Sequence, residues 1–172
     1  MSKLIITEKA DAGRRIAYFL SGGNSKSRRA KGLNYIEFGE GKEKVYLIPL
    51  SGHIVEADFP DSYKNWNTTD LNALIDAPIT KNVKSKIPFQ TLKALYKDAD
   101  EIIIATDYDR EGELIGVEAL DIMKAKRDAV SRAKFSALTG EEIKTAFEKP
   151  ISVNYSLANA ADAREQIDLI WG

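Results

Sequence analysis

Four carboxylates that follow one apolar run carry most of the chemical information in the sequence. Asp107, Asp109, Glu111 and Glu113 stand at alternate positions shortly after Ile102–Ile104. If the backbone stays extended past this run, Asp107 and Asp109 point to the same side. Closely spaced carboxylates repel each other unless a cation is present. A hard divalent ion held by oxygen, Mg²⁺ above all, is the natural partner. Alternatively, the acidic residues complement the dipole at the start of a helix.

A second polar pair follows an earlier apolar run. Glu8 and Lys9 come soon after Leu4–Ile6. Ligands of open α/β sheets bind beyond the carboxyl ends of the strands. If the two runs form neighbouring parallel strands, Glu8 meets Asp107 and Asp109 at one edge, and Lys9 stands beside them, able to hold a phosphate. The alternative is an ordinary turn before a helix.

The elements that must position these residues alternate between strand and helix patterns. Short apolar runs predict strands, and apolar residues at helical spacing predict helices. The expected strands are 4–6, 33–38, 44–50, 101–106 and 132–137, and the expected helices are 10–20, 88–97, 114–123, 140–149 and 156–171. Residues 24–32 and 57–86 are expected to be loops, and Thr139 with Glu142 forms a capping box. This alternation indicates an α/β fold with a mostly parallel sheet.

The composition excludes several classes of protein. The chain has 172 residues, 44% of them hydrophobic, and a formal net charge of −1. These values exclude a wholly polybasic protein and general disorder. The absence of cysteine and the presence of one histidine exclude disulfides, thiolate zinc sites and His-rich metal sites. No apolar run is long enough to span a bilayer, and no signal peptide is visible. We therefore expect a cytoplasmic protein without a membrane partner.

The balanced total charge hides a basic N-terminal region. Residues 1–34 contain eight Lys or Arg residues and only two acidic ones, a local charge of +6. Four of the eight fall within the expected loop: Lys26, Arg28, Arg29 and Lys31. A basic block of this kind suits a polyanionic partner, and we expect these four residues to contact single-stranded DNA. The alternative is a solvated surface loop.

The acidic motif resembles a known family. The stretch 107–113 after an apolar strand, with Thr7-Glu8-Lys9 after the first strand, resembles the Toprim domain of type IA DNA topoisomerases, and most closely the topoisomerase III-like and archaeal branch. Further matches, in order along the chain, are 51–54, 135–139, 146–147, Pro150 and 163–172. The acidic motif is highly specific, whereas the other stretches are weak alone.

The resemblance implies a fold and a division into domains. It implies a Toprim fold over 1–151, with an approximately four-stranded, mostly parallel sheet flanked by helices and a small β-hairpin or loop insertion. Residues 152–172 would begin the next, DNA-binding domain. The implied partners are single-stranded DNA and the remaining domains of the same polypeptide. The implied protein is a monomer associated with the nucleoid.

The resemblance also implies roles for individual residues. Glu8 would be the catalytic acid or base, Lys9 would steady the scissile phosphate, and Arg110 would act beside them. Mg²⁺ would be held by the carboxylates of Asp107, Asp109 and Glu111, with Glu8. Three further residues would contact DNA phosphate or support those that do: Glu113, His53 and Arg164. His53 could instead be a structural hydrogen-bonding group, and Arg164 a surface charge.

One departure from the family concerns the nucleophile. Enzymes of this family cleave one DNA strand by attack of a tyrosine, keep the 5′ phosphate on it, pass another strand through and rejoin the ends. That tyrosine is usually followed closely by Arg and Thr, a context that none of the seven tyrosines here has. We therefore expect an N-terminal fragment that is inactive alone. The alternatives are a reverse gyrase parent, a self-sufficient Toprim nuclease or primase-like enzyme, and a non-catalytic DNA-binding module.

Overall fold

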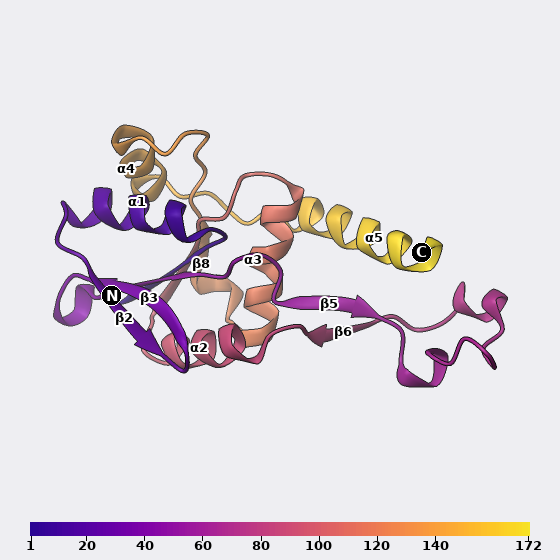
Figure 1. Ribbon diagram of the computed structural model, residues 1–172. Helices are drawn as coiled ribbons and strands as arrows, with labels where there is room; N and C mark the ends of the chain where they lie inside the picture. The colour runs from indigo at the N-terminus through magenta and orange to yellow at the C-terminus, as the bar shows by residue number, and fades with distance from the viewer.

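A six-stranded sheet forms the centre of the fold. The computed structural model describes residues 1–172, and Figure 1 shows its elements. The strands are β1 (Lys3–Thr7), β2 (Lys26–Ala30), β3 (Leu33–Phe38), β4 (Val45–Pro49), β7 (Glu101–Ile104) and β8 (Val130–Arg132), in the order β2-β3-β4-β1-β7-β8. The four strands β4, β1, β7 and β8 run parallel, and β2 and β3 extend them as an antiparallel hairpin. The predicted α/β fold with a mostly parallel sheet is therefore confirmed.

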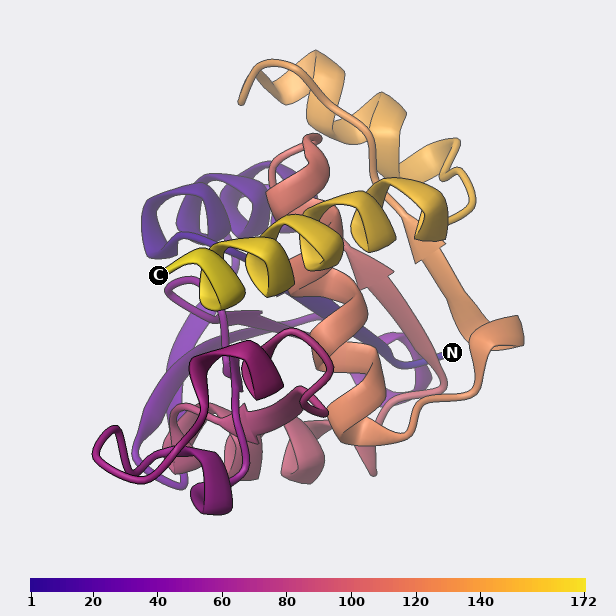
Figure 2. The ribbon, with the colours of Figure 1, turned by 90° about the vertical axis from the view of Figure 1, so that its right-hand side faces the viewer.

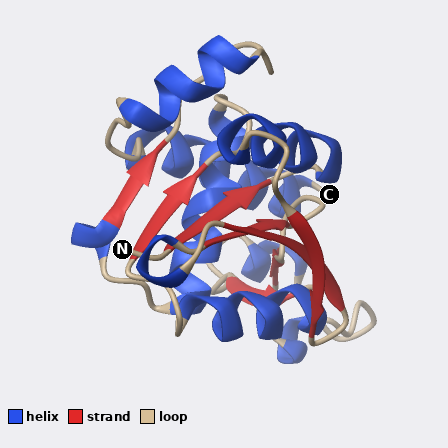
Figure 3. Ribbon diagram, turned by 90° about the vertical axis from the view of Figure 1, so that its left-hand side faces the viewer, coloured by secondary structure: helices blue, strands red, loops and turns tan.

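Helices cover both faces of this sheet, as Figure 3 shows. The helices are α1 (Ala10–Ser21), α2 (Lys86–Tyr96), α3 (Arg110–Met123), α4 (Gly140–Glu148) and α5 (Tyr155–Trp171). α1 and α4 pack on one face, and α2 and α3 pack on the other. α5 packs against α3 through a small apolar contact and lies across it in Figure 2. The domain boundary that we predict after residue 151 stays a prediction.

The apolar runs of the central strands explain the two-sided core. In β1, Leu4 and Ile6 point toward α2 and α3, whereas Ile5 points toward α1 and α4. In β7, Ile102 and Ile104 share the first direction and Ile103 the second. Side chains alternate along a strand, so a strand that is covered on both faces needs apolar residues at consecutive positions. This requirement explains why β1 and β7 are interior strands, and the two pair in parallel.

A second, two-stranded sheet projects away from the main one in Figure 1. It consists of β5 (Val55–Asp58) and β6 (Thr80–Val83), which pair antiparallel. Two 3₁₀ turns, Asp61–Tyr63 and Leu71–Leu74, lie between them. The prediction of a loop over 57–86 is wrong for the last two residues of β5 and for all of β6. Strands of four residues show no clear period, and their partners lie more than twenty positions apart, so the sequence carries little local signal for them.

Other predicted boundaries also need correction. The expected loop 24–32 contains β2, which ends at the turn formed by Lys31 and Gly32, both with positive φ. This edge strand is polar on both faces, so it lacks the alternation that identifies a strand. The last strand of the sheet spans Val130–Arg132, not 132–137, and α2 begins at Lys86, two residues before Pro88.

The predicted capping box at α4 forms only in part. The Thr139 side chain accepts the amide hydrogen bond of Glu142, as expected for an N-cap. The Glu142 carboxylate does not return to Thr139. Instead it accepts hydrogen bonds from the backbone N–H groups of Ser136 and Ala137 at 2.9 and 2.8 Å.

No helix of the fold combines the length and the apolar character that a membrane crossing requires.

Candidate functional site

The carboxyl ends of β1 and β7 bring together the two polar motifs that are far apart in the sequence. β1 and β7 are parallel neighbours, so the residues that follow them lie at the same edge of the sheet. Lys9 Nζ donates a hydrogen bond to Asp107 Oδ2 at 2.7 Å and lies 3.9 Å from Glu8 Oε1. The predicted meeting of Glu8, Lys9 and Asp107 is therefore present.

The charges in this cluster perturb one another. Partial burial and then the charge of Asp107 raise the pKa of Glu8 above its ordinary value, with a smaller contribution from Asp109, whereas the charges of Lys9 and His53 lower it. The hydrogen bond to Asp107 raises the pKa of Lys9. The Lys9 side chain is 62% exposed, so its ammonium stays open to solvent. Glu8 is thereby suited to carry a proton, and Lys9 to meet an anionic group.

Asp109 and Gly112 shape the turn that presents Asp107. Asp109 is the N-cap of α3, and its Oδ1 accepts the Gly112 N–H at 2.7 Å. A Cβ atom at Gly112 would lie only 1.9 Å from the Asp107 carbonyl oxygen. Only glycine permits so close an approach of the two backbone segments. Glycine is therefore required at this position of the acidic motif for steric reasons.

Glu113 supports this turn from the interior of the protein and is not part of the cluster of Glu8, Lys9 and Asp107. It is fully buried and forms an ion pair with the equally buried Arg132 of β8. Arg132 also donates hydrogen bonds to the carbonyl oxygens of Ile104 at 3.2 Å and Asp107 at 2.8 Å. The remaining Glu113 oxygen accepts the Asn154 N–H at 3.0 Å. The pair thus joins the end of β7 to β8 and to the start of α5.

Sequence reasoning missed Arg132 because a fully buried charged residue contradicts the expected apolar pattern of the core. The signal available was a lone arginine within the predicted strand 132–137, beside apolar positions. Buried arginines require paired carboxylates. Glu113 of the acidic motif, to which the resemblance gives a supporting role, was therefore a possible partner.

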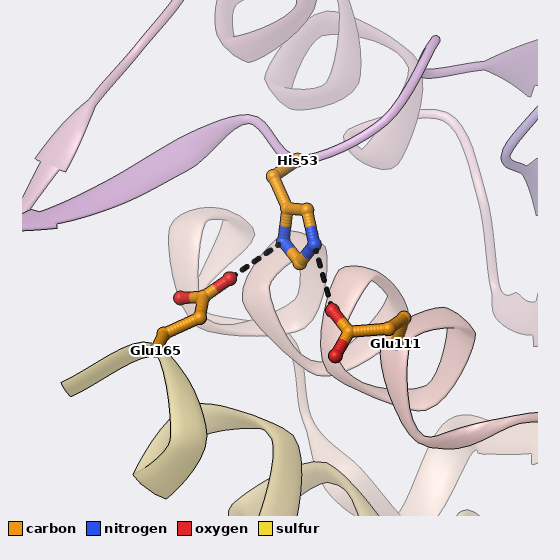
Figure 4. A group of neighbouring side chains, drawn as sticks. All are labelled: His53, Glu111 and Glu165. Carbon is orange, nitrogen blue, oxygen red and sulfur yellow. Dashed lines mark ion pairs between the residues drawn. The ribbon is translucent and has the colours of Figure 1, made fainter. Parts of the chain in front are cut away.

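His53 belongs to a second group of ionisable side chains, shown in Figure 4. Its Nε2 lies 3.3 Å from Glu111 Oε2, and its Nδ1 lies 3.5 Å from Glu165 Oε1. Nδ1 also lies 3.0 Å from Oε2 of the buried Glu118. The hydrogen bond to Glu118 is the largest cause of a raised His53 pKa, followed by the charges of Glu118 and Glu165, against an opposing effect of burial. His53 therefore connects α3, which carries Glu111, with α5.

Lys81 on β6 compensates the negative charge of the carboxylates next to His53. Its Nζ forms ion pairs with Asp162, with Glu165 at 3.2 Å and with Glu118 at 3.5 Å. These four residues come from segments far apart in the chain, so no local pattern in the sequence connects all four. One detectable signal was the helical spacing of Asp162 and Glu165, which places both on one side of α5.

One group of side chains has the spacing of metal ligands, and it differs from the predicted set. Ligand atoms of His53, Glu111 and Glu165 all lie within 4.8 Å of one another. Of the predicted ligands, Glu111 belongs to this group, whereas Asp107 is bonded to Lys9 and Asp109 to Gly112. The predicted set nevertheless offers only oxygen donors, and the charges of Asp107 and Asp109 raise the Glu8 pKa. Such mutual repulsion is relieved by a cation, so these residues suit a hard metal ion.

The remaining predicted residues lie on exposed surfaces. Arg110, the first residue of α3, is exposed and makes no ion pair. Arg164 on α5 lies 3.8 Å from Asp168, an ordinary pair on a helix surface. The four basic residues 26, 28, 29 and 31 are all exposed on or beside β2.

Comparisons with known proteins agree with this arrangement. Residues 3–138 match the Toprim domain. The chain is 66% identical to DNA topoisomerase 1 of Thermoplasma acidophilum over 99% of its length, and 47% identical to DNA topoisomerase 1 of Archaeoglobus fulgidus over its whole length. DNA topoisomerase 3-alpha of Drosophila melanogaster is 35% identical over the whole chain. These matches cover only 22%, 26% and 15% of the three relatives, so the chain corresponds to a part of each.

A solved structure supports the fold. Full-length topoisomerase I of Thermotoga maritima superimposes with a TM-score of 0.64 over 97% of this chain and 24% of its own, at 22% sequence identity. At this identity the likeness concerns the fold alone. The Toprim match over most of the chain, together with the carboxylates and lysine gathered at the ends of two parallel strands, leads to one conclusion: the chain belongs to the Toprim domain family.

Proposed function

We propose that the chain forms one half of the active site of a type IA DNA topoisomerase, which transiently cleaves one DNA strand, passes another through the break and rejoins it. The observation that carries this proposal is the contact of Lys9 with Asp107, 2.7 Å apart, beside Glu8. One edge of the sheet then holds Glu8 as a proton carrier, Lys9 as a cation for the phosphate, and Asp107 with its neighbouring carboxylates as oxygen ligands. The names of the relatives, all DNA topoisomerases, support it.

Glu8 and Lys9 act on the scissile phosphodiester in this proposal. Glu8 holds the proton that the 3′ oxygen of the cleaved strand takes up as it leaves, and recovers it during rejoining. A raised pKa suits this role, because the carboxyl must exchange a proton near neutral pH. The exposed ammonium of Lys9 contacts the phosphate and stabilises the charge that develops on it. Arg110, exposed on the next turn, contacts a phosphate oxygen beside it.

Mg²⁺ is the proposed metal, held by Asp107, Asp109 and Glu111 with Glu8. When bound, Mg²⁺ would orient the DNA backbone and offset its phosphate charge. The protein residues contribute oxygen ligands of the type that Mg²⁺ prefers. His53 orients Glu111 from the opposite side through the 3.3 Å contact. Glu113 acts indirectly, because its ion pair with Arg132 supports the Asp107 backbone.

Single-stranded DNA is the proposed substrate, and the exposed basic side chains of β2 and its turn contribute contacts that do not depend on sequence. These residues are Lys26, Arg28, Arg29 and Lys31. Arg164 on α5 contributes a further phosphate contact. We propose that the protein acts as a monomer and associates with the nucleoid through these contacts.

The attacking tyrosine is proposed to come from another part of the same polypeptide. Tyr108, the tyrosine nearest to the carboxylates in sequence, packs its ring against Lys134, whose Nζ lies 4.5 Å from the ring centre, and against Arg132. The relatives are several times longer than this chain and leave room for a domain that supplies the nucleophile. A covalent nucleophile must lie within reach of its proton carrier.

The test is a Mg²⁺ titration of the ¹⁵N-labelled chain followed by NMR. We expect shifts centred on Glu8, Asp107 and Asp109, with weak affinity because Mg²⁺ keeps several waters. The double variant Asp107→Asn/Asp109→Asn should abolish them. A matched control, Asp61→Asn/Asp128→Asn, removes two carboxylates elsewhere on the surface and should leave the titration unchanged.

Three outcomes would contradict the proposed metal site. Shifts spread evenly over all surface carboxylates would indicate nonspecific screening. Shifts centred on His53 and abolished by Glu165→Gln would assign the ion to the second group of ligands instead. The absence of any response to Mg²⁺ would favour a non-catalytic DNA-binding module.

A further inference from the structure

A groove of about 410 Å³ continues from Lys9 along α1. Its lining residues come from α1 and from the neighbouring hairpin: Ala10, Arg14, Tyr18, Ser25, Ser27, Asn34, Tyr35, Ile36 and Pro49. Ala10 directly follows Lys9, and Pro49 pairs with Thr7 at the end of β1. One end of the groove therefore opens at the candidate site. Its volume lies within the range of sites that bind small organic groups.

One wall of the groove is a single stripe of α1. Ala10, Arg14 and Tyr18 follow each other at intervals of four, so they lie on one side of the helix. Tyr18 is 61% exposed, an unusual state for a large aromatic side chain. Its ring lies against Gly23, where a Cβ atom would be only 3.4 Å away. Arg14 is exposed, and its ion pair with Asp11 is also on the surface.

The floor of the groove is the face of the hairpin that looks toward α1. Ile36 packs against the apolar cluster beneath α1 and pairs with Ser27 of β2. Asn34, two residues before Ile36, pairs with Arg29. Side chains alternate along strands, so Ser27, Asn34 and Arg29 share the face of Ile36. The floor is therefore made of small polar groups, with a cation at its rim.

We propose that this groove binds a nucleobase of the single-stranded DNA segment that passes Lys9. The base stacks on Tyr18, and the flanking phosphates contact Arg14 and Arg29. This inference rests on the proposed function, because it extends the path of the same strand. Single-stranded nucleic acids are bound by aromatic faces that stack with bases inside a positively charged groove. A base paired in a duplex keeps both its faces stacked, so the site selects the single-stranded form.

The geometry favours DNA over a free small molecule. The groove begins one residue from the ammonium proposed to hold a phosphate. Arg14 lines it, and Arg29 is the cross-strand partner of the lining residue Asn34. A continuous polyanion contacts all three, whereas an isolated nucleotide spans only one or two of them. The small side chains of Ser27 and Asn34 offer hydrogen-bonding groups without selecting one base edge, which suits binding without sequence preference.

The test measures binding of a fluorescent deoxythymidine oligonucleotide to the 172-residue chain by anisotropy at low salt. Tyr18→Leu keeps an apolar side chain but removes the aromatic face, and it should weaken binding by about fivefold or more, the lower bound for loss of one stacked base. Tyr18→Phe should bind within about twofold of the unmodified chain, because stacking needs the ring and not the hydroxyl. Trp66→Leu is the matched control, an aromatic residue that is 72% exposed and lines a different pocket.

A second measurement locates the base directly. An oligonucleotide carrying 5-bromodeoxyuridine is irradiated in the complex, and the crosslinked peptide is identified by mass spectrometry. We expect the crosslink on Tyr18, and excess deoxythymidine monophosphate should compete poorly. Efficient competition by the mononucleotide would overturn the assignment to a continuous strand.

Lys9→Met separates this inference from the proposed function. If Lys9→Met weakens binding but Tyr18→Leu does not, and the crosslink maps elsewhere, the groove assignment is overturned while the proposed function stands. If Tyr18→Leu weakens binding and Lys9→Met does not, the groove is supported and the role of Lys9 is overturned. If the unmodified chain does not bind single-stranded DNA at all, both proposals fail.

Discussion

Replacing Glu113 by Gln should strongly destabilise the fold, because it leaves the Arg132 charge buried without a carboxylate. Both side chains are 0% exposed, so neither water nor salt can compensate the lost charge. Glutamine keeps the shape of glutamate, and no cavity forms. Removing one partner of a buried ion pair costs about 3 to 5 kcal/mol. The total free energy of unfolding of a domain of this kind is about 5 to 15 kcal/mol. We therefore expect the loss of a large part of its stability.

The same substitution should also loosen the candidate site. Arg132 donates to the Asp107 carbonyl at 2.8 Å and to the Ile104 carbonyl at 3.2 Å, and its position depends on Glu113. If the guanidinium moves toward solvent, these carbonyls lose their donors and the turn that presents Asp107 loses its support. Weaker binding of Mg²⁺ at temperatures where the variant remains folded would reveal this second effect.

Urea unfolding followed by circular dichroism measures the first effect. With a slope of about 2 kcal/mol per molar urea, a loss of 4 kcal/mol lowers the midpoint by about 2 M. Asp121→Asn is the matched control, since Asp121 pairs with Arg127 on the exposed surface and such a pair contributes at most about 1 kcal/mol. A loss below about 1 kcal/mol for Glu113→Gln, no larger than the control, would refute the reasoning.

Two further predictions concern the turn after β7 and the loop before α4. Gly112→Ala should destabilise the chain by at least about 2 kcal/mol in the same urea experiment, because its Cβ would lie 1.9 Å from the Asp107 carbonyl oxygen. Gly41→Ala meets open space and is strained only by the positive φ of this residue, so it should cost less, and equal costs would contradict this explanation. The amide groups of Ala137 and Ser136 lower the pKa of Glu142. The stabilisation is therefore present above the unfolded carboxyl pKa and lost as pH falls through the folded value. Thermal unfolding should show Glu142→Gln less stable than the unmodified chain at pH 7 and equal to it in strong acid, and a difference that persists at low pH would count against the mechanism.

The sequence by itself determined the parallel centre of the fold and named the condition under which its two polar motifs meet. The apolar runs in β1 and β7 require burial on both faces, and this places the two strands inside a parallel sheet. Local patterns were sufficient for the strands themselves, because each apolar run carried its own signal. The pairing of β1 with β7, which the structure supplies, then brings Glu8, Lys9 and Asp107 to one edge, because the carboxyl ends of parallel neighbours lie together.

Only the tertiary structure decided the features that depend on pairs far apart in the sequence. β2 is a strand because β3 pairs with it, although its own residues are polar and exposed. Arg132 lies inside the fold because Glu113, on a different element, neutralises it there. Lys81 joins β6 to α5 through Asp162, a partner 81 positions away. In each case the free energy comes from an interaction between segments, so neither segment alone carries a readable pattern.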